Sequence, residues 1–131
     1  PLPLVGSLLP IYRKYFGAKE DIAHPRYRHL RHRLIEIFKS HPGIIYAAGH
    51  EHNLQHIARE DNHFIISGAG SKLKYVLREG KNLKFGIKAK GFFKLRVEAD
   101  GFAKLQAWVV DSRLERGKLV YEYEVGQLIK E

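Results

Sequence analysis

An amphipathic stretch that leads directly into a short apolar run most limits how this chain can fold. Proline suits the first helical position, and apolar side chains follow Pro25 at helical spacing as far as Phe38. Ser40-His41-Pro42-Gly43 ends that pattern, and residues 43–48 read Gly-Ile-Ile-Tyr-Ala-Ala. Such a run is typical of a buried strand in a parallel sheet. A helix that feeds this strand predicts an α/β layer.

The rest of the chain predicts strands joined by turns. Besides 43–48, the expected strands cover residues 54–59, 63–67, 92–98, 102–109 and 119–125. Ala99-Asp100-Gly101 separates two alternating segments and is the strongest hairpin signal in the sequence. Residues 1–24 predict irregular or short helical structure. The fold class we expect is α/β (α+β), with one helix-strand unit followed by antiparallel strands.

Length and composition narrow the class of protein. The 131 residues suit one domain, with residues 1–71 as its helix, strand and loop part and residues 72–131 as its β-rich end. No cysteine is present, which excludes disulfides, cysteine zinc sites and thiol nucleophiles, and the apolar runs are too short to span a bilayer. No methionine is present either, so we expect the chain to be part of a longer product.

The net charge of +9 is concentrated in two blocks. Residues 12–39 carry eight Lys and Arg against three Asp and Glu, and residues 72–96 carry nine against one. Such blocks attract phosphates of nucleic acids, lipid head groups or small esters. A solvated lysine-rich surface explains them equally well. Lys72, Lys74 and Arg78 would bring this charge near the loop at 67–71.

The apolar strand runs into Gly49-His50-Glu51-His52, a candidate metal site. In an extended segment His50 and His52 would point to the same side with Cα atoms roughly 6.5 Å apart, a spacing that suits two neighbouring metal ions. Gly49 would let the backbone turn at the carboxyl end of the strand, where open α/β sheets place their sites. The chain holds eight histidines, so a His-x-His pair does not by itself indicate a metal site. The alternative is that this pair binds no metal.

The longer string Gly49-His50-Glu51-His52-Asn53-Leu54-Gln55, followed by Ser67-Gly68-Ala69-Gly70-Ser71, resembles the last metal-binding block of calcineurin-like metallophosphoesterases of the purple acid phosphatase type. The opening Pro1-Leu2-Pro3-Leu4-Val5-Gly6-Ser7-Leu8, with Ile11-Tyr12-Arg13-Lys14-Tyr15 and His24-Pro25-Arg26-Tyr27, is similar to bacterial envelope proteins in which such a phosphoesterase precedes an outer-membrane β-barrel. The resemblance implies the periplasm or outer membrane, and the C-terminal part of a β-sandwich with flanking helices.

The resemblance also implies hydrolysis of phosphate esters by two transition metals, either divalent or trivalent, such as Fe, Zn or Mn. His50 would ligate one metal and His52 the other. Glu51 would contact the substrate or remain a solvent-exposed residue. The remaining loop residues would be structural: Gly49, Asn53, Gln55, Ser67, Gly68 and Gly70. Of these, Asn53 and Gln55 would hold the loop by hydrogen bonds.

The earlier metal-binding blocks of that family are missing from this sequence. Asp61-Asn62-His63 contains similar residues, but it follows the final block and reads as a turn. His29 and His32 read as surface residues of the helix, and His56 would share a side with His52 only if the strand ran straight. We therefore expect the isolated chain to be inactive, and its partner to be the missing N-terminal part of the same domain or a second copy in a homodimer.

Two other functions stay open. The first is a non-enzymatic basic module that binds nucleic acid or anionic lipid through residues 12–39 and 72–96, although no nucleic-acid signature favours it. The second is a structural or adaptor piece whose β-rich end docks on its parent protein.

Overall fold

A computed structural model describes residues 25–76, 80–111 and 116–128. The expectation of irregular or short helical structure for residues 1–24 lies outside the described residues. The chain forms two units, residues 1–41 and 42–131, and each is considered by itself.

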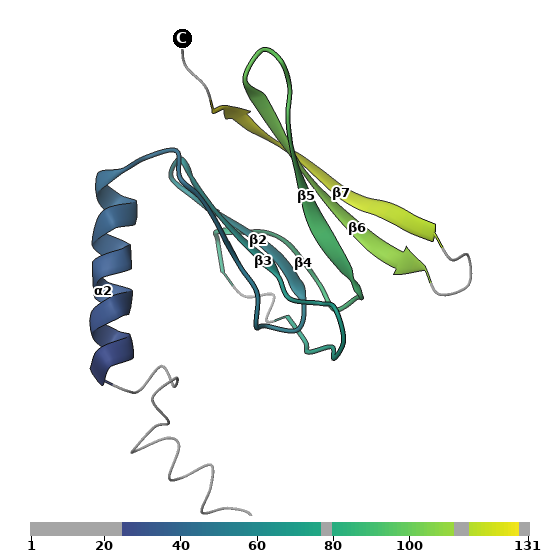
Figure 1. The fold of residues 1–131 in the computed structure, drawn as a ribbon, viewed down its shortest axis with the longest axis horizontal. Helices are drawn as coiled ribbons and strands as arrows, with labels where there is room; N and C mark the ends of the chain where they lie inside the picture. Colours follow the sequence, from purple (N-terminus) through teal and green to yellow (C-terminus); the bar gives the residue numbers. More distant parts are fainter. Residues whose placement is uncertain (1–24, 77–79, 112–115, 129–131) are drawn as a thin grey trace, which may run out of the picture. The chain divides into compact units, whose positions relative to one another are not determined.

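The described part of the first unit is helix α2, Pro25–Ser40, which confirms the helix that the sequence predicts (Figure 1). Its end is closed locally: the Ser40 hydroxyl donates to the Glu36 carbonyl at 3.1 Å, and the His41 backbone N–H donates to the Ile37 carbonyl at 3.1 Å. These bonds satisfy carbonyls that the last turn leaves unpaired. Within the described residues, no helix has the length and apolar character to cross a membrane.

The second unit begins with a four-stranded sheet, called the first sheet here. It contains β1 (Ile45–Ala48), β2 (Leu54–Arg59), β3 (Asn62–Ser67) and β4 (Leu83–Ile87) in the order β1-β3-β2-β4. β1 pairs with β3 in parallel, and the other pairs are antiparallel. The sequence predicts the first three strands, but β1 is partly exposed and not buried as expected, and β4 was not expected.

A three-stranded antiparallel sheet, called the second sheet, follows. It contains β5 (Gly91–Val97), β6 (Phe102–Asp111) and β7 (Arg116–Gln127) in the order β5-β6-β7. Gly101 has a φ of 80°, and the Asp100 carboxylate accepts the Phe102 N–H at 3.1 Å. The hairpin that the Asp-Gly pair predicts is therefore confirmed, and β7 is longer than the sequence indicates.

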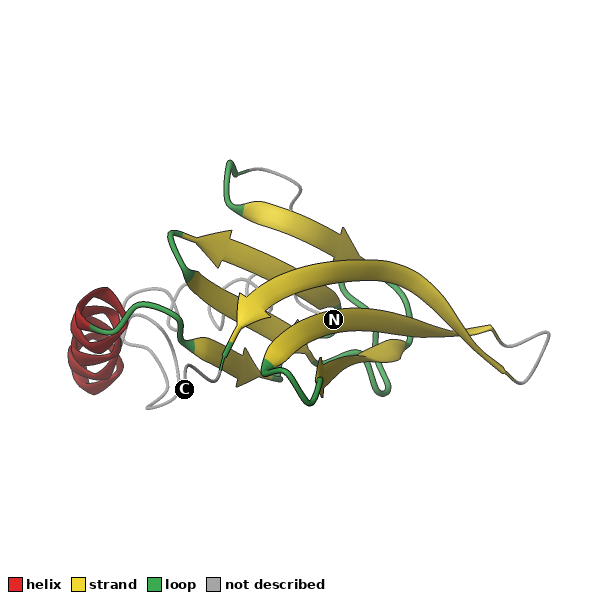
Figure 2. Ribbon diagram, turned by 90° about the horizontal axis from the view of Figure 1, so that it is seen from above, coloured by secondary structure: helices red, strands yellow, loops and turns green. Residues whose placement is uncertain are grey.

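The two sheets of the second unit, whose strands are yellow in Figure 2, pack through aromatic side chains. The Phe85 ring of β4 stacks on Tyr121 of β7 with centroids 4.4 Å apart, and it meets Phe93 of β5 edge-on at 6.2 Å. Among the described residues, the buried hydrophobic side chains are Leu54, Ala58, Ile65, Ala69, Ala103, Leu105 and Ala107. The fold is mixed α and β, with one helix and two sheets rich in antiparallel pairs.

Candidate functional site

One edge of the first sheet gathers the loops that the sequence singles out. Because β1 and β3 are parallel, with Ala48 opposite Ile66, their carboxyl ends lie at the same edge. β2 begins there as well, with Leu54 opposite Ser67. The loop at 49–53 leaves β1 and the loop at 68–74 leaves β3, so the sheet brings both halves of the predicted motif together.

Gly68 lets these two loops approach each other closely. A Cβ atom added at Gly68 would collide with the carbonyl oxygen of Glu51, which is a rigid backbone atom. The Gly68 N–H donates to the Asn53 carbonyl at 3.2 Å, and the Lys74 N–H donates to the His52 carbonyl at 2.8 Å. The residue type at 68 is therefore fixed by backbone contact.

Asn53 holds the loop at 49–53, called the histidine loop here, in place through its buried side chain. Its side chain is 2% exposed; its amide Nδ2 donates to the Tyr75 carbonyl at 3.4 Å, and its Oδ1 accepts the Gln55 Nε2 at 2.9 Å. The structure thus gives Asn53 and Gln55 hydrogen bonds that hold the loop. A buried amide without these partners would destabilise the fold.

The backbone of the histidine loop is not extended, so the expected strand-like geometry of His50 and His52 is wrong. His50 has a φ of 71°, and the Glu51 N–H donates to the Gly49 carbonyl at 2.9 Å. The Asn53 N–H donates to the Glu51 carbonyl at 2.8 Å, which makes a second tight turn. The turn therefore falls on His50 and not on Gly49. Histidine tolerates a positive φ better than most side chains do.

The two histidines occupy different environments. His50 is exposed, as is Glu51, whereas His52 is half-buried. The Nδ1 atom of His52 is buried and has no hydrogen-bond partner. Buried polar atoms are almost always paired, so an unpaired imidazole nitrogen in a tethered loop fits a ligand that the protein alone does not supply.

The described residues hold no group of three or more His, Cys, Asp and Glu side chains placed to bind one metal ion. The candidate ligands that this loop offers are the imidazoles of His50 and His52, with the Glu51 carboxylate between them. Asp61, Asn62 and His63 do not add to them, because Asn62 and His63 belong to β3 and lie at its opposite end. The buried Asn62 accepts the Ile44 N–H at 2.9 Å and holds the start of β1 against β3.

A second histidine pair, which the sequence interpretation missed, lies between the two sheets of the second unit. His56 of β2 is fully buried and His63 of β3 is 6% exposed, and their rings stack with centroids 5.2 Å apart. The alternation of Leu54, His56 and Ala58 was the available signal, because it places His56 on the apolar face of β2.

No protein-family model, curated protein or solved structure matches this chain. The resemblance of residues 49–55 and 67–71 to metallophosphoesterases therefore stays a prediction.

Proposed function

We propose that this chain supplies the last two histidine ligands of a dinuclear metal centre that hydrolyses phosphate esters. His50 would bind one metal ion and His52 the other. The observation that carries the proposal is the buried, unpaired Nδ1 of His52 in a loop held at the carboxyl end of a parallel strand.

The rigidity of the loop supports this role. The segment after β3 is bonded to the carbonyls of His52 and Asn53, and Asn53 is in turn held by Gln55. Metal ligands need positions fixed to a fraction of an ångström, which such support provides.

Two metal ions of this kind activate a water molecule and offset the charge that develops on phosphate oxygens. Three features of this chain would suit that chemistry: the two imidazoles, the Glu51 carboxylate and the positive charge of Lys74. Neutral imidazoles suit Fe, Zn or Mn. Glu51 is exposed beside them and is free to contact the substrate, while the Lys74 backbone is bonded to His52 and brings a cationic residue next to the loop. Positive charge at this point attracts an anionic ester.

Two histidines do not hold two metals, so the proposal requires ligands from the preceding part of the same domain. Apolar side chains left exposed on the second sheet agree with a missing partner: Phe92 is 51% exposed, Val97 47% and Phe102 49%. We expect the isolated chain to be inactive and the extended protein to be active in a bacterial cell envelope.

The test is hydrolysis of an aryl phosphate by the protein extended N-terminally to the whole domain, with Mn²⁺, Fe²⁺ or Zn²⁺ supplied. His50→Ala and His52→Ala should each lower the rate by about a hundredfold or more, since losing even a residue that only orients a ligand costs roughly 10- to 100-fold. His32→Ala, on the exposed face of α2, is the matched control and should leave the rate unchanged.

An extended protein that binds no transition metal, or that keeps its activity without both histidines, contradicts the proposal. Salt-sensitive binding of nucleic acid or anionic vesicles that survives both substitutions would favour the basic-module function instead.

A further inference from the structure

A chain of hydrogen bonds crosses the interface between the two sheets of the second unit. The Tyr121 hydroxyl of β7 lies 2.9 Å from Nδ1 of His56, and Nε2 of His56 lies 3.0 Å from Nδ1 of His63. Tyr123 also packs on both imidazoles, with ring centroids 4.8 Å from His56 and 5.6 Å from His63. β7 is thus joined to β2 and β3 through two histidines.

The protonation states of His56 and His63 decide whether this series of hydrogen bonds can form. With both imidazoles neutral, a single hydrogen lies between His56 Nε2 and His63 Nδ1, and each bond has one donor and one acceptor. With both imidazoles protonated, two N–H groups would face each other across the same 3.0 Å. The bond would then be lost, and two positive charges would be confined in the interface.

The surroundings favour the neutral state of both rings. Burial, the neighbouring His63 and Lys84 of β4 lower the pKa of His56 to about 4. Burial also lowers the pKa of His63, with Lys84 adding to the effect and the carboxylate of Asp61 opposing it. Burial and the nearby Tyr123 raise the pKa of Tyr121 to about 12, so its hydroxyl stays protonated.

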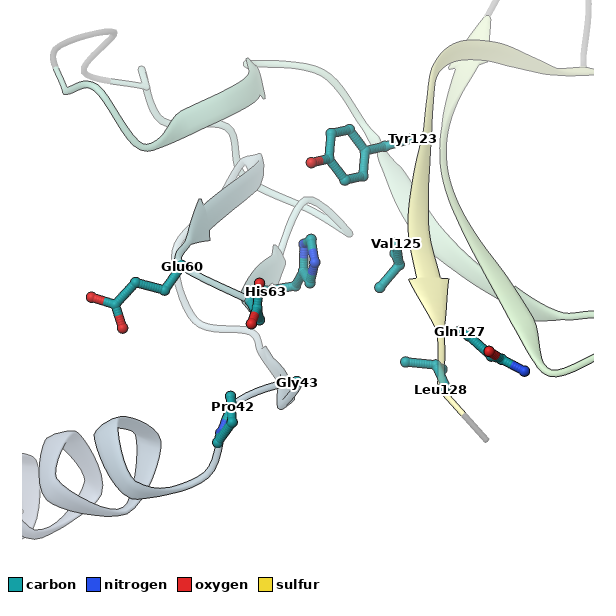
Figure 3. Close-up of a pocket in the computed structure, with 9 residues that line it drawn as sticks. Pro42, Gly43, Glu60, His63, Tyr123, Val125, Gln127 and Leu128 are labelled. Carbon is teal, nitrogen blue, oxygen red and sulfur yellow. The ribbon is translucent and has the colours of Figure 1, made fainter. Parts of the chain in front are cut away.

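Solvent can approach these hydrogen bonds at the end where His63 lies. A cavity of about 630 Å³ opens beside the β2–β3 turn, and His63, Tyr123 and Val125 line it together with Glu60 and Asp61. In Figure 3 the His63 ring points towards Tyr123 and Val125, while the Glu60 carboxylate points away. His63 is therefore the member of the pair that lies next to solvent, and His56 lies behind it.

We propose that His56 and His63, with Tyr121 and Tyr123, form an acid-sensitive latch that holds the two sheets together at neutral pH and releases them on acidification. His63 lies at the other end of β3 from Ser67 and the histidine loop. The latch would give an envelope protein a stability that responds to the acidity outside the cell.

The sign of the effect follows from the two protonation states. In the unfolded chain both histidines have a pKa near 6.5, so below that pH the unfolded state binds more protons than the folded state. The stability conferred by the neutral pair is complete above about pH 6.5 and is lost as the pH falls towards 4. For His56 alone, the unfolding equilibrium constant should rise about a hundredfold between pH 7 and pH 4.

Urea denaturation of the full chain between pH 8 and pH 4 tests the latch. His56→Gln and His63→Gln keep a neutral donor and acceptor, so they should flatten the loss of stability between pH 6.5 and 4. His32→Gln removes an exposed histidine and should leave the wild-type pH dependence unchanged. Equal slopes in the wild type and both interior variants would overturn the proposal.

A second measurement needs no variant and covers the case in which one does not fold. Proton NMR of the wild type should show the His56 and His63 rings titrating below the ordinary histidine pKa of 6.5. Ring contacts between His56 and Tyr123 should disappear as the interior pair titrates. Ordinary titration of His56 and His63 near pH 6.5, with those contacts retained, would overturn the latch.

Discussion

At the scale of single residues, the histidine loop depends on a glycine that contributes no functional group. Gly68→Ala should lower the free energy of unfolding by about 1–3 kcal/mol, because its Cβ would collide with the Glu51 carbonyl and force the loops apart. Gly70→Ala is the matched control: a Cβ there meets nothing within 4 Å, so its effect should stay within about 0.5 kcal/mol. Urea denaturation at neutral pH measures both, and equal stabilities would refute the close contact.

The sequence predicted which residues form this loop but not its conformation. The His-x-His spacing indicated an extended segment, whereas the backbone turns at His50 with a φ of 71°. Local pattern could not reveal this, because the loop also contacts Lys74 and Gly68, which approach from a distant part of the chain. The unpaired Nδ1 of His52 likewise depends on neighbours that only the folded chain provides.

At the scale of elements, Asn62 joins the start of β1 to β3. Asn62→Ala would leave the part-buried Ile44 N–H without its acceptor, which should cost about 1–3 kcal/mol of stability. Asn82→Ala removes an exposed side chain just before β4 and should change stability by less than about 0.5 kcal/mol. If thermal or urea unfolding gave the same loss for both, the buried hydrogen bond would not have the assigned role.

The elements that the sequence predicted well carry strong local signals. Pro25 marks the start of α2, and Asp100 with Gly101 marks the turn before β6. β4, Leu-Lys-Phe-Gly-Ile, escaped prediction although its apolar residues alternate, because it is short and has a glycine in its interior. Its pairing with β2 also shifts register between His56 and Ile57. Its place in the sheet depends on the partner strand and not on local propensity.

At the scale of the whole second unit, the joint between the sheets should also be sensitive to alkali. Tyrosines of the unfolded chain ionise near pH 10, whereas the pKa of Tyr121 is raised to about 12, so stability should fall as the pH rises from 10 to 12. Tyr121→Phe removes one titrating group, so it should reduce the slope of the free energy of unfolding against pH by the equivalent of up to one proton. Tyr75→Phe, at a ring that is 82% exposed, is the control, and identical slopes in both variants would contradict the assigned role of the half-buried Tyr121 hydroxyl.

The central claim is that the loop at 49–53 binds metal through His50 and His52, and paramagnetic NMR of the N-terminally extended protein tests it most directly. Substoichiometric Mn²⁺ should broaden the amide resonances of residues 49–53 and 68–74 first, because these segments are bonded to each other. His52→Ala should weaken that broadening, because one of the two loop ligands is lost, while His32→Ala should leave it unchanged. Broadening confined to α2, or unchanged at the loop in His52→Ala, would contradict the account.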